Sequence, residues 1–200
     1  MGQDVTVRGV GTYQLFFLYS LQSEQDRLDF LQRTRSIVEY TQVWWSVRPH
    51  TFFGTVEVRI CDAQTRGEES FALAGLIAAC IAQAAMAYDE FGYEGRGAPL
   101  RDREIEENLW RAIRHGTSGR LIDFRRGEEV EAAAALEEVL TWTEPARTQL
   151  GIEVDLPGRN GAQRAREALD AGVSIEDIYR DAVAETKRTY TATPQGAEQA

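Results

Sequence analysis

The sequence predicts an α+β protein, with strands in its first half and helices in its second. Two runs rich in β-branched and aromatic residues, 40–47 and 55–61, are typical of strands, and helical patterns dominate from residue 68 onward. A chain of 200 residues, of which 43% are hydrophobic, is long and apolar enough to bury a core.

The N-terminal part offers one clear element. Residues 23–38 predict an amphipathic helix, because Leu28 and Leu31 stand among charged residues and Ser23 is a suitable N-cap. The preceding run, 5–20, mixes β-branched and aromatic residues, and its pattern leaves a strand and a short helix equally open.

The two strand-like runs predict a β-hairpin. Their connection contains Pro49 and Gly54 and is longer than a tight two-residue loop. In the second run apolar residues alternate with Glu57 and Arg59, so one face of the strand is apolar and the other is charged.

A long apolar helix is expected over residues 68–91. Its most apolar part, 71–87, falls short of the roughly 20 residues that cross a membrane. Its many small residues favour a buried helix, so no membrane partner is expected. Residues 92–99 contain three glycines and a proline and predict a flexible connector.

Four more helices are expected, over residues 101–115, 128–143, 161–171 and 175–189. Asn160 stands directly before the third of them, where an N-cap belongs. Ser174 and Asp177 give the fourth a start that resembles a capping box.

Charge and composition exclude several classes of function. The formal net charge is −10, and the 22 basic residues are scattered along the chain, which argues against binding to nucleic acid. All of them except Lys187 are arginines, which bind carboxylates and phosphates with two parallel hydrogen bonds. The two cysteines form no CxxC pair, and residues 1–10 resemble no secretion signal, so a cytoplasmic location is expected.

Motifs for several kinds of site are missing from the sequence. It contains no GxxxxGK[ST] loop, no complete GxGxxG fingerprint, no HExxH and no GxSxG. A phosphate-binding loop, a dinucleotide site, a zinc site and a serine nucleophile at an elbow are therefore not predicted.

The charged face of the hairpin is the first candidate site. Glu57 and Arg59 are two residues apart on a strand, so both side chains point to the same side, about 7 Å apart along the chain. A carboxylate beside a guanidinium could bind a divalent cation and the phosphate that accompanies it. The alternative is an ordinary ion pair on a solvent-exposed sheet.

A second candidate lies on the helix expected over residues 101–115. Asn108, Arg111 and His115 are spaced by three and four residues and share one face, while Leu109 and Ile113 are free to face the core. An amide, a guanidinium and an imidazole suit a carboxylate or a phosphate. The alternative is a helix-stabilising ion pair between Glu107 and Arg111 and a histidine at the C-terminal end of the helix dipole.

Five collinear segments carry a family resemblance: 40–50 (YTQVWWSVRPH), 53–65 (FGTVEVRICDAQT), 107–116 (ENLWRAIRHG), 119–123 (GRLID) and 160–186. They resemble the type 2 glutamate-cysteine ligase, or carboxylate-amine ligase, family. The resemblance implies three parts: a segment without assignment over 1–34, the C-terminal half of a catalytic domain over 35–190, and a polar tail over 191–200.

The resemblance implies a fold like that of glutamine synthetase, here a partial antiparallel sheet with C-terminal helices. It also implies an ATP- and Mg²⁺-dependent ligase that joins the side-chain carboxylate of glutamate to an amine, such as that of cysteine, through an acyl phosphate. In that scheme Glu57 binds the metal, and Arg59 and Arg48 bind phosphate or the substrate carboxylate. Asn108, Arg111 and His115 bind substrate or nucleotide.

The sequence also departs from the family pattern. The N-terminal half of the family carries a Gly-x-Glu-x-Glu-like motif and a His-x-His motif, and neither occurs here. We therefore expect either a separate chain with that half or a homo-oligomer to complete the site. The alternative is a non-catalytic remnant or subunit with a binding or structural role.

Overall fold

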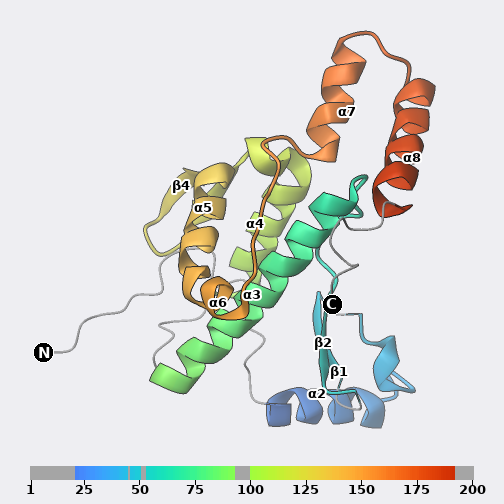
Figure 1. The fold of residues 1–200 in the computed structure, drawn as a ribbon. Helices are drawn as coiled ribbons and strands as arrows, with labels where there is room; N and C mark the ends of the chain where they lie inside the picture. The colour runs from blue at the N-terminus through green and yellow to red at the C-terminus, as the bar shows by residue number, and fades with distance from the viewer. Residues whose placement is uncertain (1–20, 45, 51–52, 93–99, 192–200) are drawn as a thin grey trace, which may run out of the picture. The chain divides into compact units, whose positions relative to one another are not determined.

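The computed structural model describes residues 21–44, 46–50, 53–92 and 100–191. Contacts divide the chain into two compact units. One comprises Ile77–Gly151 and the described residues up to Cys61, and the other comprises Asp62–Leu76 and the described residues from Ile152 onward. Helices and two antiparallel two-stranded sheets confirm the predicted α+β class (Figure 1).

The first sheet is the expected hairpin, formed by β1 (Val47–His50) and β2 (Thr55–Val58). Arg48 stands opposite Glu57 in its register. The predicted start of the first strand, residue 40, was wrong, because Tyr40–Gln42 forms a short 3-10 helix, η2, and the strand begins at Val47. The side-chain oxygen of Gln42 accepts hydrogen bonds from the N–H groups of Val38 and Glu39, and this local turn replaces strand pairing.

The N-terminal helix, α2 (Leu21–Arg33), is shorter at its C-terminal end than predicted. The hydroxyl of Thr34 donates to the carbonyl of Phe30, and Arg35 adopts a left-handed conformation with φ 59°. These two features end the helix before residue 38. The undecided run at 5–20 lies outside the described residues.

Helix α3 (Gly67–Phe91) is close to its predicted bounds. By length and composition alone it could cross a membrane, and only 22% of its most apolar window is buried in the described structure, so the expected buried helix is not confirmed. A core helix of a soluble protein meets the same criterion. The buried residues of α3 include small ones that share one face: Ala72, Ala79, Cys80 and Ala84.

A second hairpin was missed by the sequence prediction. After α4 (Asp102–His115) and the 3-10 turn η4 (Gly116–Ser118), strand β3 (Arg120–Asp123) pairs with β4 (Glu128–Glu131). The carboxylate of Asp123 accepts hydrogen bonds from the N–H groups of Arg125 and Arg126, and Gly127 has φ 71°, which builds the turn. The helix predicted over 128–143 therefore begins only at residue 132.

Helix α5 (Ala132–Trp142) is followed by the short α6 (Glu144–Leu150), which the sequence analysis did not predict. Thr143 joins them and is fully buried, and its hydroxyl donates to the carbonyl of Val139. Pro145 is tolerated because it stands in the first turn of α6. The buried core here includes Ala135, Val139 and Ala146.

The last two helices, α7 (Gly161–Asp170) and α8 (Ile175–Thr191), begin as predicted. Asn160 caps α7 by accepting a hydrogen bond from the N–H of Gln163 at 2.9 Å. Ser174 accepts from the N–H of Asp177 at 3.1 Å, which confirms the expected start of α8. The connector predicted at 92–99 lies outside the described residues from 93 on.

Candidate anion-binding site

The charged face of the β1–β2 hairpin holds three of the predicted site residues together. Glu57 lies between two guanidinium groups and binds Nη2 of Arg48 through one oxygen and Nε of Arg59, at 2.7 Å, through the other. Arg48 reaches Glu57 from the neighbouring strand, and Arg59 follows directly after β2. The structure therefore brings these three side chains into one cluster.

The two arginines differ in what else they bind. Nη1 of Arg48 donates to the carbonyl oxygens of Thr41 and Val43 at 3.0 and 3.3 Å, and only 14% of the side chain is exposed. The side chain of Arg59 is 34% exposed, and its described hydrogen bond is the one from Nε to Glu57. Arg48 is thus occupied by the protein, whereas Nη1 and Nη2 of Arg59 have no partner among the described residues.

The guanidinium of Arg59 lies over an aromatic ring. The Cζ atom of Arg59 lies 5.4 Å from the centroid of the Trp44 ring, within the range of a cation–π interaction. Trp44 itself is 77% exposed. Its neighbour Trp45 lies outside the described residues.

The arginines also set the charge state of Glu57. Partial burial raises the pKa of this carboxyl, but the hydrogen bond from Arg59 and the charges of Arg48 and Arg59 outweigh it. The pKa of Glu57 is therefore lower than usual, and the group is ionised at neutral pH. The cluster carries two positive charges against one negative charge and is suited to an anion.

A metal ion fits this cluster less well. Both oxygens of Glu57 are bound by guanidinium groups, so a cation would have to displace one of them. Within the described part of the chain, no group of three or more His, Cys, Asp or Glu residues is arranged to hold a metal. The residues described here do not form a Mg²⁺ site by themselves.

The second predicted set, on α4, does not form one ligand-facing surface. Asn108 is only 2% exposed, and its amide is used by the backbone of Ile122. Arg111 binds Glu107 at 3.0 Å and Glu129 of β4 at 2.7 Å. The hydrogen bonds to Glu129 and Glu107 raise the pKa of Arg111. The hydrogen bond from Arg111 in turn lowers the pKa of Glu129.

His115 ends α4 with an exposed side chain that meets the Trp110 ring edge-on, with centroids 5.9 Å apart.

The prediction that Leu109 and Ile113 face the core was wrong, since both are exposed. The reason is that β3 packs on the side of α4 that carries Asn108. The polar contacts of the hairpin cluster lie within residues 41–59, and those of Asn108 and Arg111 lie within 107–129.

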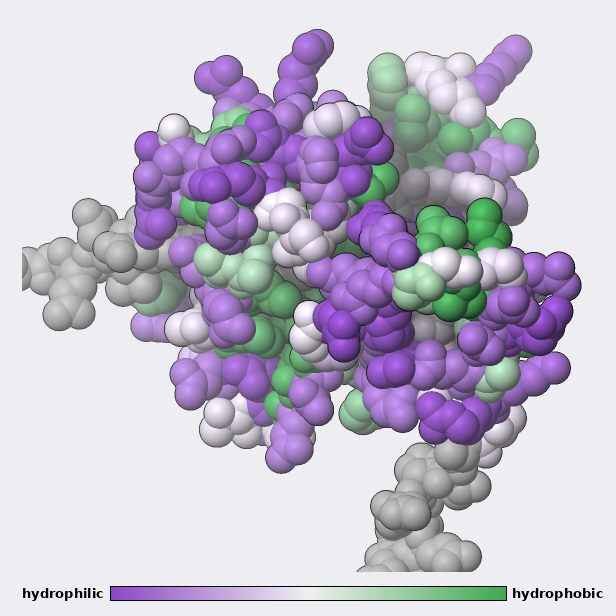
Figure 2. Space-filling view, turned by 90° about the horizontal axis from the view of Figure 1, so that it is seen from above, coloured by the Kyte–Doolittle hydropathy of each residue, from purple (hydrophilic) through white to green (hydrophobic). Residues whose placement is uncertain are grey.

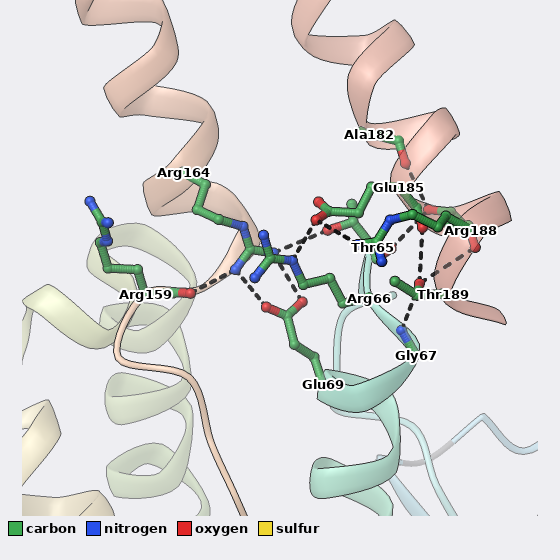
Figure 3. Close-up of polar contacts among 11 residues, drawn as sticks. Thr65, Arg66, Gly67, Glu69, Arg159, Arg164, Ala182, Glu185, Arg188 and Thr189 are labelled. Carbon is green, nitrogen blue, oxygen red and sulfur yellow. Dashed lines mark hydrogen bonds and ion pairs between the residues drawn. The ribbon is translucent and has the colours of Figure 1, made fainter. Parts of the chain in front are cut away.

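A third polar cluster was not predicted. Arg164 of α7 binds both oxygens of Glu69, in the first turn of α3, at 2.5 and 3.1 Å, and Glu69 is 5% exposed (Figure 3). Arg66 donates to Oε1 of Glu185 of α8 at 2.7 Å, and Nη2 of Arg188 lies 3.7 Å from the same oxygen. The hydrogen bond to Glu69 raises the pKa of Arg164.

This third cluster fastens α7 and α8 to the start of α3. Both Nη atoms of Arg164 are occupied, because they also donate to the carbonyl of Arg159 and to the hydroxyl of Thr65. The acidic first turn of α3 was visible in the sequence, but its partner stands 95 residues away and no local pattern marks it. A groove of about 180 Å³ between α7 and α8 is lined by small residues such as Ala165 and Ala168 together with the charged Arg164, Asp181 and Glu185.

The surface shown in Figure 2 is mainly hydrophilic. Figure 2 shows one face on which hydrophilic residues dominate and hydrophobic residues form separate, smaller areas. Several arginines in the described part of the chain are paired with neighbouring carboxylates, as the ion pairs of Arg111, Arg120 and Arg180 illustrate.

Comparison with known proteins adds a family. The sequence matches glutamate-cysteine ligase family 2 over residues 17–192. A relative from Sorangium cellulosum, provisionally named glutamate–cysteine ligase 2, is 37% identical over 150 residues, which are 74% of this chain and 37% of the relative. Relatives of the same name from Solibacter usitatus and Herpetosiphon aurantiacus are 36% and 38% identical.

These alignments cover the relatives only in part. The Solibacter alignment spans 195 residues, which are 90% of this chain and 49% of the relative. The Herpetosiphon alignment spans 153 residues, which are 76% of this chain and 37% of the relative. The chain therefore corresponds to less than half the length of these relatives.

Proposed function

Because this chain belongs to glutamate-cysteine ligase family 2, we propose that it forms part of a ligase that joins the side-chain carboxylate of glutamate to an amine. In this reaction ATP phosphorylates the carboxylate, which gives ADP and an acyl phosphate. The amine then attacks the acyl carbon, phosphate leaves, and the amine loses a proton to give the amide. The relatives' names make cysteine the first amine to test.

Arg59 is the residue that supports the proposal most directly. Its guanidinium is held at Nε by Glu57, and its Nη1 and Nη2 atoms are free of described partners. A guanidinium edge of this kind binds two oxygens of a phosphate or carboxylate at once. Charge neutralisation and positioning account for most of the catalysis of phosphoryl transfer, so an arginine that contacts the transferred group is a suitable catalytic residue.

The other assigned residues have roles that follow from their contacts. Arg48 orients Glu57, because its own guanidinium is already occupied. Asn108 fixes β3 to α4. Arg111 would contact substrate or nucleotide only by giving up Glu107 or Glu129, and the exposed His115 is the other candidate for that contact. Glu57 is a candidate metal ligand only in a complete site, since Mg²⁺ bound to nucleotides takes one or two carboxylates together with phosphate oxygens.

A complete site needs the remaining part of the family's catalytic domain. The relatives are more than twice as long as the segments that match this chain. We propose that this part comes from another chain or from a second copy of this one, in the cytoplasm. Residues 35–190 would then be one half of the catalytic domain.

ADP release is the direct test. The full chain is mixed with glutamate, Mg²⁺, ATP and a panel of amines, with and without the part of the Solibacter relative that this chain does not match. We expect ADP to form in the complemented mixture and to be abolished by Arg59→Ala and Glu57→Gln. Full activity of both variants would refute the assignment of these residues.

The second candidate function is that of a non-catalytic subunit. It is favoured by the ion pairs that occupy Glu57 and by the buried position of Asn108, both of which suit a structural role. This candidate predicts neither nucleotide binding nor ADP release, even in the complemented mixture. The same assay therefore separates the two functions.

A further inference from the structure

Arg59 is restrained on two sides. Along its edge, Nε donates to Oε1 of Glu57 at 2.7 Å, and Glu57 is itself bound by Arg48. On another side, its Cζ atom lies over the indole ring of Trp44, 5.4 Å from the ring centroid. Its Nη1 and Nη2 atoms have no partner among the described residues.

Burial does not account for the position of Trp44. Its side chain is 77% exposed, so it removes little apolar surface from water. The described interaction of its ring is the one with Arg59. An indole is the strongest of the aromatic side chains in a cation–π interaction, which suits a role in holding a guanidinium.

We propose that Trp44 is a positioning residue, which fixes the Arg59 guanidinium so that its Nη1–Nη2 edge points toward a phosphate or carboxylate group. The inference deepens the proposed function and rests on it, because it assigns the residue that prepares Arg59 for its anion. Arg48 contributes to the same positioning, because it binds the carboxylate of Glu57, and that carboxylate binds Arg59.

The physical basis is the freedom of the arginine side chain. An unrestrained arginine samples many rotamers and loses that freedom when an anion binds, which weakens binding. Glu57 and Trp44 remove much of that freedom beforehand. An exposed cation–π interaction is worth a few-fold in an equilibrium constant, so we expect an effect of about threefold on anion affinity.

Inorganic tripolyphosphate titrated into the full chain tests the inference without any need for turnover. Affinity is measured by calorimetry, and the Nε–Hε resonance of Arg59 is followed by NMR, because an indole ring shifts the resonance of a proton held near its face. We expect Trp44→Leu to weaken binding about threefold and to move this resonance, and Trp44→Phe to restore much of both. Tyr179→Leu, a change at a similarly exposed aromatic residue on α8, is the matched control and should alter neither.

The outcomes separate the inference from the proposed function. If Arg59→Ala abolishes binding while Trp44→Leu binds as tightly as wild type, the role of Trp44 is refuted and that of Arg59 stands. If the wild-type chain does not bind tripolyphosphate, or if Arg59→Ala binds it as well as wild type, the anion-binding role of Arg59 is refuted and the role of Trp44 falls with it.

Discussion

The side-chain amide of Asn108 is joined to the backbone of Ile122 by two hydrogen bonds. Its oxygen accepts from the N–H of Ile122 at 2.7 Å, and its nitrogen donates to the carbonyl of the same residue at 2.8 Å. The amide thus forms, with the backbone of β3, the pair of hydrogen bonds that a residue of a neighbouring strand would form. Because this pairing is buried, it fastens the second hairpin to α4.

Asn108→Ala should therefore destabilise the protein. The substitution leaves the N–H and carbonyl of Ile122 without partners, which costs about 1–3 kcal/mol in the free energy of unfolding. Glu106→Ala, at an exposed position of the same helix, should change it by less than about 0.5 kcal/mol. Urea unfolding followed by circular dichroism measures both, and equal midpoints would show that the pairing contributes nothing.

Arg164→Ala should lower the free energy of unfolding by more than Asn108→Ala does. The substitution leaves the nearly fully buried Glu69 without its guanidinium partner, which costs about 3 kcal/mol in the free energy of unfolding. Replacing both residues together, as in Glu69→Leu with Arg164→Met, should cost less than Arg164→Ala alone, because no unpaired charge remains buried.

Arg159→Ala is the control for this pair. The Arg159 side chain is exposed and bound to Glu167, so removing it should lower the free energy of unfolding by no more than about 0.5 kcal/mol. Amide hydrogen exchange in α7 reports on the same changes locally. Unchanged exchange in Arg164→Ala would contradict the fastening role of this contact.

Gly119→Ala should disturb the junction between α4 and β3. A Cβ atom at residue 119 would lie 2.5 Å from Cβ of His115, which is closer than any normal contact, so the backbone must shift. We expect a loss of about 1–3 kcal/mol in the free energy of unfolding. Gly158→Ala, where a Cβ would meet nothing within 4 Å, should be neutral. A Gly119→Ala variant as stable as Gly158→Ala would rule out this packing constraint.

The Glu57 cluster should make stability depend on pH in the acid range. The ordinary pKa of its carboxyl is 4.5, and in the folded chain the pKa is lower. The unfolded chain therefore takes up a proton first as the pH falls, which favours unfolding. The stabilisation from Glu57 is complete above pH 4.5 and is lost as the pH falls through the folded pKa.

An NMR titration of the Glu57 carboxyl carbon measures this shift. Arg59→Ala should raise the pKa of Glu57, since it removes a hydrogen bond and a positive charge. If the pKa of Glu57 were the same in Arg59→Ala as in wild type, the bond between Arg59 and Glu57 would not exist in solution.

Much of the fold was predictable from local patterns. The bounds of α3, the start of α7 at Asn160 and the start of α8 at Ser174 follow from apolar runs and capping residues. The second hairpin was not, because residues 128–131 are mostly glutamates and become a strand only through pairing with residues 120–123. Propensity is a weak guide wherever a partner strand decides the outcome.

The candidate site was predicted in part. The spacing of Glu57 and Arg59 on one strand placed them on the same face, and the structure joins them. Spacing on α4 placed Asn108 and Arg111 on one face as well, but β3 and β4 cover that face and use both side chains. Trp44 entered the cluster only through its contact with Arg59.

The sequence by itself determined the α+β class, the extents of the long helices, the charged strand and the family resemblance, because each depends on residues close together in the chain. Only the tertiary structure decided which charged groups are already occupied. Nη1 and Nη2 of both Arg48 and Arg164 are bound, whereas those of Arg59 have no partner among the described residues, and no local pattern distinguishes these three arginines. The reason is that a guanidinium is occupied or free according to neighbours that folding supplies, and for Arg164 that neighbour stands 95 residues away.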